Sequence, residues 1–181
     1  MLFRSSCRKK SETITVPVSH TKTNFSLYNN GNNSAFDANN INNIAYNSSD
    51  SSIWIGTDSG LVVFKNNSWK KLNSSNSGLT NNKVNAIEFA SGNIVWVGTD
   101  NGLYKFDGIS WTVFNTGNSL IPINKIRALC IAPDNSLWIG TFSGGGLAKF
   151  DGANFTVYTP SNSGLPNNSV GTVYVDQLNV V

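Results

Sequence analysis

Apolar and polar residues of this 181-residue chain alternate in short runs, and one apolar run returns at a fixed interval. Trp54-Ile55-Gly56-Thr57 is followed 42 residues later by Trp96-Val97-Gly98-Thr99, and after the same interval by Trp138-Ile139-Gly140-Thr141. Other columns keep the step, namely Leu61, Leu103 and Leu147 and then Phe64, Phe106 and Phe150, with the third copy longer by two residues. A self-similarity of this kind indicates one structural unit that is repeated along the chain.

Each unit is predicted to form four short strands. In the second unit these are the β-branched run 84–89, the tryptophan motif, residues 103–106, and a stretch after the turn at Asp107-Gly108. Asp-x-Gly turns of the hairpin type follow the motif, and no stretch shows helical periodicity with caps. Four strands in about 42 residues are typical of a β-propeller blade, so the fold class is all-β, with four-stranded antiparallel blades.

The glycine inside each motif predicts how neighbouring blades meet. Alternation along a strand places Trp54 and Gly56 on one face of the sheet, with Ile55 and Thr57 on the other. A residue without a side chain beside a large ring lets the next blade approach closely, and the indole fills the space between blades. Burying such a ring contributes about 2–3 kcal/mol. The alternative interpretation is that the tryptophans are platforms that stack on sugars.

The consensus of the units reads Ile-x-Ala-[Ile/Leu], then Asn-x-[Ile/Leu]-Trp-Ile-Gly-Thr-x-x-Gly-Leu-x-x-Phe. This pattern resembles the two-component regulator propeller repeat, over roughly residues 25–181. In that family, propellers form the extracytoplasmic ligand-sensing part of bacterial sensor kinases and related surface proteins. The resemblance therefore implies a periplasmic or extracellular sensor module. Nothing in the chain matches a kinase, a receiver or a DNA-binding motif.

The repeat also predicts the domain organisation. Residues 1–24 are expected to be a disordered basic leader, without the apolar stretch of a signal peptide. Propeller blades are expected over residues 25–181, as a partial unit 25–40, three whole units 41–83, 84–125 and 126–169, and a partial unit 170–181.

The partial units predict an incomplete propeller. Propellers close with about four to eight blades. Either the chain is part of a larger propeller, whose gene continues with Trp-[Ile/Val]-Gly-Thr after Val181, or residues 25–28 complete a four-bladed ring. Open strand edges invite pairing with another chain, so self-association through blade edges is expected.

Composition narrows the classes of function. Residues 1–22 hold an excess of four positive charges, whereas residues 23–181 hold an excess of one negative charge. The blades therefore have no basic surface for nucleic acid. No apolar run approaches the roughly 18 residues that cross a membrane. Two cysteines and one histidine are too few for a disulfide framework or a zinc site.

Positions that differ between units are the candidates for ligand binding, because packing positions repeat. The loops between blades and the turns after the motif are predicted to open on one face. The second residue of the first strand and the residue after the motif both vary there, as Asn42, Asn85 and Arg127 and as Asp58, Asp100 and Phe142. Such side chains could bind a small polar or carbohydrate-like ligand through hydrogen bonds and one stacking surface.

Each candidate has a structural alternative. The two aspartates suit hairpin turns. The two asparagines could hydrogen-bond only channel water, and Phe142 with the following glycines could be a simple insertion. Arg127 is the most distinctive candidate, as a lone cation in its column.

No catalytic set is visible, since the single histidine, His20, lies outside every blade and no metal cluster or phosphate loop occurs. No catalytic residue, metal or cofactor is therefore expected. Three functions compete: a ligand-sensing module of a bacterial two-component protein, a structural or protein-interaction propeller at the cell surface, and a propeller lyase. The expected partner is a small molecule or glycan, not nucleic acid.

Overall fold

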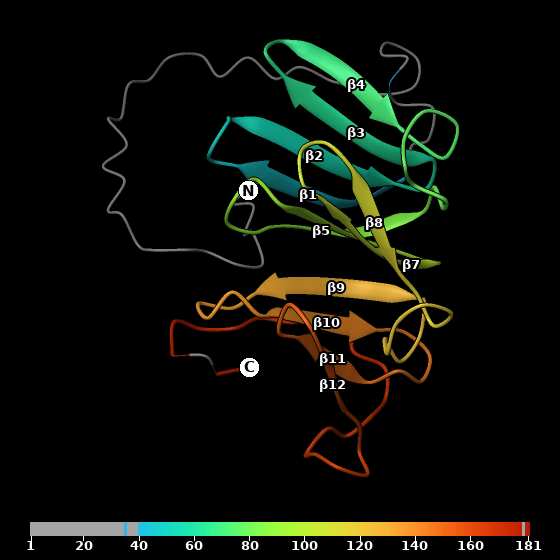
Figure 1. Cartoon of the computed structure of the whole chain (residues 1–181), viewed down its shortest axis with the longest axis vertical. Coiled ribbons are helices and arrows are strands. Elements are labelled where there is room, and N and C mark those ends of the chain that lie inside the picture. The colour runs from blue at the N-terminus through green and yellow to red at the C-terminus, as the bar shows by residue number, and fades with distance from the viewer. Residues whose placement is uncertain (1–34, 36–39, 179) are drawn as a thin grey trace.

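The computed structural model describes residues 35, 40–178, 180 and 181. Within these residues twelve strands form three antiparallel sheets of four, and in each sheet the neighbouring strands are consecutive in the chain. Figure 1 shows the three sheets following one another along the long axis of the molecule. The described residues contain no helix that is long and apolar enough to span a membrane.

The three sheets are called the first, second and third blade. The first blade consists of β1 (Ile41–Asn47), β2 (Ser52–Thr57), β3 (Gly60–Lys65) and β4 (Ser68–Leu72). The second consists of β5 (Val84–Phe89), β6 (Val95–Thr99), β7 (Gly102–Phe106) and β8 (Trp111–Phe114). The third consists of β9 (Ile126–Ile131), β10 (Leu137–Thr141), β11 (Leu147–Phe150) and β12 (Phe155–Tyr158).

These sheets confirm the predicted all-β fold with four-stranded propeller blades. The first strands β1, β5 and β9 lie next to one another, so they form the inner side of the array. The fourth strands β4, β8 and β12 are at the other edge of each sheet (Figure 1). The predicted leader and the predicted strand at residues 25–28 lie outside the described residues.

The first strand of every blade is interrupted at the same position by a β-bulge. Its pairing with the second strand shifts register there, so that one extra residue stands between two paired ones. The extra residues are Asn42, Asn85 and Arg127. A bulge re-aims the side chain of its extra residue, and these three side chains are therefore placed alike relative to their blades.

The glycines of the repeated motif lie at the seams between blades, as predicted. A Cβ atom built on Gly56 would lie 2.7 Å from Cγ1 of Val84, and one on Gly98 would lie 2.5 Å from Cγ2 of Ile126. Both partners are the first residue of the next blade's first strand. Separations this short do not occur between real side chains, so only glycine allows the observed approach.

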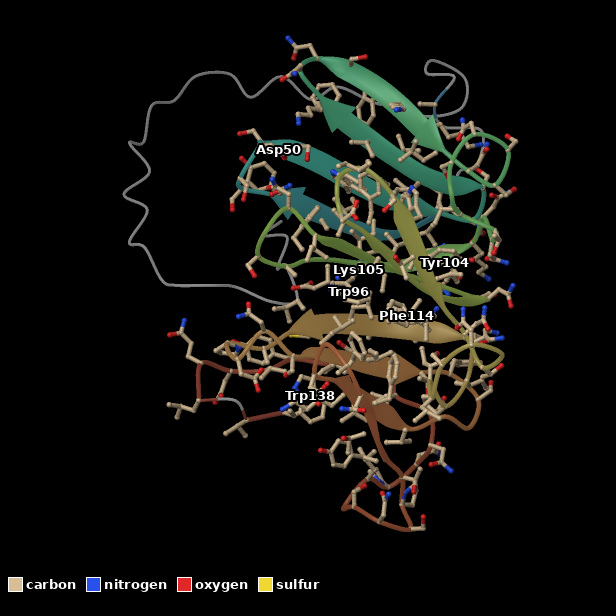
Figure 2. All side chains as sticks on the ribbon, viewed as in Figure 1. Asp50, Trp96, Tyr104, Lys105, Phe114 and Trp138 are labelled. Carbon is tan, nitrogen blue, oxygen red and sulfur yellow. The ribbon has the colours of Figure 1, made fainter. Side chains whose placement is uncertain are left out.

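The tryptophans of the motif fill these seams. Trp54, Trp96 and Trp138 are 8%, 5% and 9% exposed. The ring of Trp96 lies 5.8 Å from that of Phe114 in its own blade (both labelled in Figure 2). It also lies 5.8 Å from the ring of Phe150 in the third blade. Trp54 and Trp96 therefore have no free face for a sugar, which argues against the stacking-platform interpretation for these two residues.

Residues 170–178 follow the path of one more first strand beside the third blade. Val173 is 4% exposed and belongs to the same apolar cluster as Trp138. The amide of Asp176 donates to the carbonyl of Val180 at 3.0 Å, which repeats the bond that closes the turn after β5. The third tryptophan is therefore covered by the chain that follows its own blade.

The loops between blades are held by their own asparagine and serine side chains. After β4, Asn76 Nδ2 donates to the carbonyl of Lys71 at 3.1 Å, and Ser77 Oγ donates to the carbonyl of Asn73 at 2.7 Å. The same two bonds recur after β8 and after β12. The asparagine-rich composition thus has a local structural cause.

The third loop lacks one bond of this pattern. After β8, Asn124 Oδ1 accepts a hydrogen bond from the amide of Thr116 at 2.8 Å, and the loop after β4 has the equivalent bond. In the third loop the donor position is Pro160, which has no N–H group. Asn168 Oδ1 is consequently buried without a partner among the described residues.

Candidate functional site

The inner strands of the three blades enclose a cavity of about 380 Å³, together with residues 171–173. Three of the predicted ligand-binding residues line it, namely the bulge residues Asn42, Asn85 and Arg127. The other three predicted residues, Asp58, Asp100 and Phe142, follow the second strand of each blade and do not line the cavity. The cavity is thus bordered by polar side chains from bulges in all three blades.

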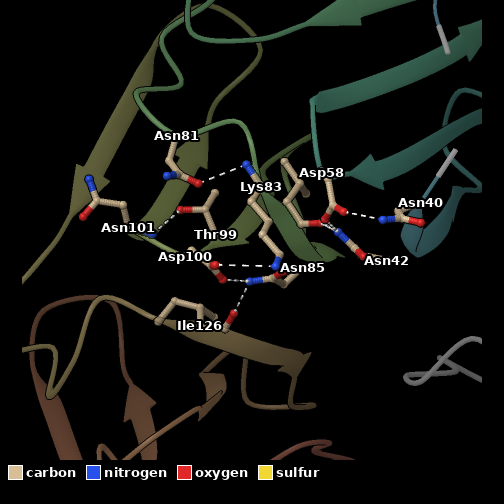
Figure 3. A network of polar contacts seen from close by, with 11 residues as sticks. Asn40, Asn42, Asp58, Asn81, Lys83, Asn85, Thr99, Asp100, Asn101 and Ile126 are labelled. Atoms are coloured by element: carbon tan, nitrogen blue, oxygen red, sulfur yellow. Dashed lines mark hydrogen bonds and ion pairs between the residues drawn. The ribbon is translucent and has the colours of Figure 1, made fainter. Parts of the chain in front are cut away.

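In the first blade the bulge asparagine holds an aspartate and reaches the next blade. Asn42 Nδ2 donates to Asp58 Oδ1 at 2.9 Å and to the carbonyl of Val84 at 3.0 Å. Asn40 Nδ2 donates to the other oxygen of the same carboxylate at 2.7 Å (Figure 3). The hydrogen bonds from Asn42 and Asn40 lower the pKa of Asp58, because they favour the charged carboxylate.

The second blade repeats this arrangement in a more buried setting. Asn85, which is 6% exposed, donates from Nδ2 to Asp100 Oδ1 at 2.7 Å and to the carbonyl of Ile126 at 2.9 Å. Lys83 Nζ lies 3.7 Å from Asp100 Oδ2 (Figure 3). In both blades, therefore, one asparagine joins the aspartate of its own blade to the backbone of the next; we call this pair the Asn–Asp clip.

Turn formation does not explain the aspartates of the clip. The hydroxyl of Thr99 donates to the carbonyl of Gly102 at 3.0 Å and accepts from the amide of Asn101 at 3.0 Å, so threonine closes this turn. Thr57 makes the same two bonds in the first blade. The turns therefore do not need the carboxylates of Asp58 and Asp100, which accept hydrogen bonds from the asparagines instead.

In the third blade the same backbone carries different side chains. The amide of Phe142 donates to the carbonyl of Lys125 at 3.1 Å, as that of Asp100 does to Lys83 at 3.3 Å. Arg127 is exposed, and Lys125 Nζ lies 4.8 Å from the ring centroid of Phe142, which is 42% exposed. Within the described part of the chain, neither cation is paired with a carboxylate.

Sequence reasoning missed the residue that precedes each first strand. Asn40, Lys83 and Lys125 share this position. The sequence did carry a signal for this position, because its residue has a hydrogen-bond donor in the side chain in all three blades. Asn43 was also missed; its Oδ1, like that of Asn85, is buried and accepts no hydrogen bond from the described residues. Those same residues contain no group of side chains suited to a metal ion.

We expect Asn85→Ala to lower the free energy of unfolding by about 1–3 kcal/mol, because the carbonyl of Ile126 and the carboxylate of Asp100 lose their shared donor. Urea denaturation followed by tryptophan fluorescence measures the change. Asn101→Ala is the matched control, since Asn101 is exposed and only its backbone amide bonds to the turn. Equal losses in the two variants would show that the clip adds no specific stability.

Comparison with known proteins gives one match to a family model: residues 121–143 correspond to the two component regulator propeller. The chain carries a two-component regulator propeller repeat. The matched residues run from the loop before β9 to the turn after β10, so they include the third-blade bulge and Phe142. No curated protein matches the chain.

Solved structures with the same fold include extracellular domains of two component systems and a lyase. The extracellular domain of a hybrid two component system from B. thetaiotaomicron is 24% identical, with a TM-score of 0.71, and covers 86% of this chain. That of another such system from the same organism is 22% identical, with a TM-score of 0.64 and 84% coverage. Streptogramin B lyase is 13% identical, with a TM-score of 0.60 and 77% coverage.

The propeller chain is much shorter than these structures. It spans 22% and 21% of the two extracellular domains and 46% of the lyase. The likenesses show the fold of the repeat array.

Proposed function

We propose that the chain is a section of the ligand-sensing propeller of a bacterial two-component signalling protein, and that it binds a small polar or carbohydrate-like ligand. The observation that carries the proposal is the polar cavity of about 380 Å³ where the bulged first strands meet. A volume of this size suits a small molecule. The extracellular domains of two component systems that share this fold support an extracytoplasmic location for the module.

The chemistry around the cavity favours a ligand with several hydroxyl groups. Arg127 offers hydrogen-bond donors to the cavity, and the lining also contains the polar residues Asn42, Asn43 and Thr172, whose side chains carry both donor and acceptor groups. A hydroxyl group can both donate and accept, so it can satisfy either kind of partner. A sugar-like ligand would meet these requirements better than an apolar one.

The clips suggest how binding would be transmitted. Asn85 belongs to the second blade, yet it bonds to the backbone of the third through Ile126. A ligand that bonds to Asn85 and Arg127 together would change how these two blades are held against each other. A shift of this kind, passed to a membrane-linked effector, is the proposed signal.

One observation favours the alternative of a structural or protein-interaction propeller. Ile41, Ile44 and Tyr46 on β1 are 49%, 49% and 59% exposed. Ile87, at the position of Ile44 in the second blade, is 3% exposed. An apolar strand face of this kind suits contact with another polypeptide, including a second copy of the chain.

A binding screen tests the sensing function. The purified full chain is melted in the presence of a panel of mono- and oligosaccharides, neutral and acidic, and each ligand that raises the melting temperature is titrated by calorimetry. We expect at least one ligand to bind, and Arg127→Ala to weaken its binding by roughly tenfold or more, because a hydrogen bond from a charged donor is lost.

Lys70→Ala is the matched control, because Lys70 lies exposed on the outer strand β4, away from the cavity. A ligand that binds the wild type and Arg127→Ala equally well would move the site away from the bulges. A panel without any ligand, together with concentration-dependent association of the chain, would favour the interaction module instead.

A further inference from the structure

Each clip holds its carboxylate between two donors that flank the first residue of the first strand. In the second blade these donors are Lys83 and Asn85, on either side of Val84, and the carboxylate is that of Asp100. The first blade uses two asparagines in the same places. The backbone of the bulge thus brings two donor side chains to one negative group.

The third blade keeps the donors and lacks the negative group. Lys125 and Arg127 flank Ile126 as the donors of the other blades flank their first residue. The carboxylate position is taken by Phe142, whose backbone bond to Lys125 matches that of Asp100 to Lys83. Two cationic residues therefore occupy the chain positions whose side chains bind a carboxylate in the other blades, and within the described residues neither is paired with a carboxylate.

We propose that this third-blade bulge is an anion site, in which Lys125 and Arg127 bind a carboxylate of a small acidic ligand. The inference deepens the proposed sensing function and depends on it only for the role of that ligand. The ligand carboxylate takes the part that the aspartates play in the first and second blades.

The surroundings fit a carboxylate that enters from the cavity. Arg127 is exposed and lines the cavity, and its planar guanidinium can give two parallel hydrogen bonds to a carboxylate. The exposed ring of Phe142 offers an apolar wall beside the charged groups, where it already contacts Lys125. The carboxylate of Asp100 does not compete for Arg127, since it is bound by Asn85 and Lys83.

Acetate is the probe, because it has the carboxylate of an aspartate side chain and little else. The ¹⁵N-labelled full chain is titrated with sodium acetate at constant ionic strength, and the side-chain Nε–Hε signal of Arg127 is followed by NMR. Arg127→Lys assigns this signal among the three arginines of the chain. We expect a saturable shift with acetate and none with neutral acetamide. A shift that does not saturate, or none at all, overturns the anion site.

Two variants of Phe142 separate charge from size. Phe142→Asp supplies an internal carboxylate and should weaken acetate binding by about tenfold or more. Phe142→Asn introduces a side chain of the same size and shape as aspartate but without the charge, and should leave acetate binding intact. The amide spectrum of each variant checks that it is folded. Equal acetate binding by the two variants would overturn the proposal, whether both bind or neither does.

The two proposals can fail separately. Acetate binding to Arg127 without any ligand in the saccharide screen would leave the anion site standing and contradict the sensing function. A neutral saccharide that requires Arg127, combined with no acetate response, would support sensing and refute the anion site.

Discussion

Trp96→Ala is expected to lower the free energy of unfolding by about 3–5 kcal/mol, which is a large part of the stability of a small domain. The indole is 5% exposed and contacts Phe114 and Phe150, so its removal leaves a void across the seam between two blades. Chemical denaturation monitored by circular dichroism measures the loss. The midpoint should fall strongly, because Trp96 packs in one apolar cluster with residues of both sheets.

Trp111→Ala is the comparison for this effect. Trp111 is half-buried on the outer strand β8, where its ring stacks on Phe106 at a centroid distance of 4.8 Å within the same blade. Its loss should cost clearly less than that of Trp96, because Trp111 is only half-buried whereas Trp96 is 5% exposed. Equal costs would mean that seam packing does not hold the array together.

Gly98→Ala is expected to lower the free energy of unfolding by about 1–3 kcal/mol, although it adds a single methyl group. The new Cβ would lie 2.5 Å from Cγ2 and 3.0 Å from Cβ of Ile126, so the third blade would have to move away. Inside a strand, alanine is otherwise more stabilising than glycine. A loss of stability in this variant would therefore come from the close contact with Ile126. Thermal melting of the purified variant measures it.

Gly164→Ala is the matched control for this substitution. Gly164 is exposed, and a Cβ atom at this position would meet nothing within 4 Å. We expect a change within about 0.5 kcal/mol. If Gly98→Ala proved equally harmless, the glycine would not be required by the approach of the next blade.

The sequence was sufficient for the strands and for the seams because both repeat. A tryptophan and a glycine two residues apart share a face of a strand, so Trp96 and Gly98 could be assigned to one seam before any coordinates were known. The residue that the glycine meets was not predicted; in the structure it is Ile126, the first residue of the next unit. Periodicity carries this information because packing between like units requires like residues.

The clip could not be predicted in the same way. Asn85 and Asp100 are 15 residues apart, and their contact depends on a bulge that the periodic pattern does not reveal. The sequence showed only that both columns change together in the third unit, to Arg127 and Phe142. An aspartate before a glycine-containing turn is readily interpreted as a turn residue. For this reason its hydrogen bond to the first strand was not predicted from the sequence.

Each seam joins two different surfaces, and this asymmetry determines how further blades can be added to the chain. In every seam the second strand of one blade, with its tryptophan and glycine, meets the first strand of the next, so the two joined surfaces are unlike. An interface of this heterologous kind adds units head to tail and gives no two-fold pair. Tandem duplication of a single 42-residue segment supplies both surfaces of a new seam at once. An array of this type can therefore lengthen without evolving a new complementary surface.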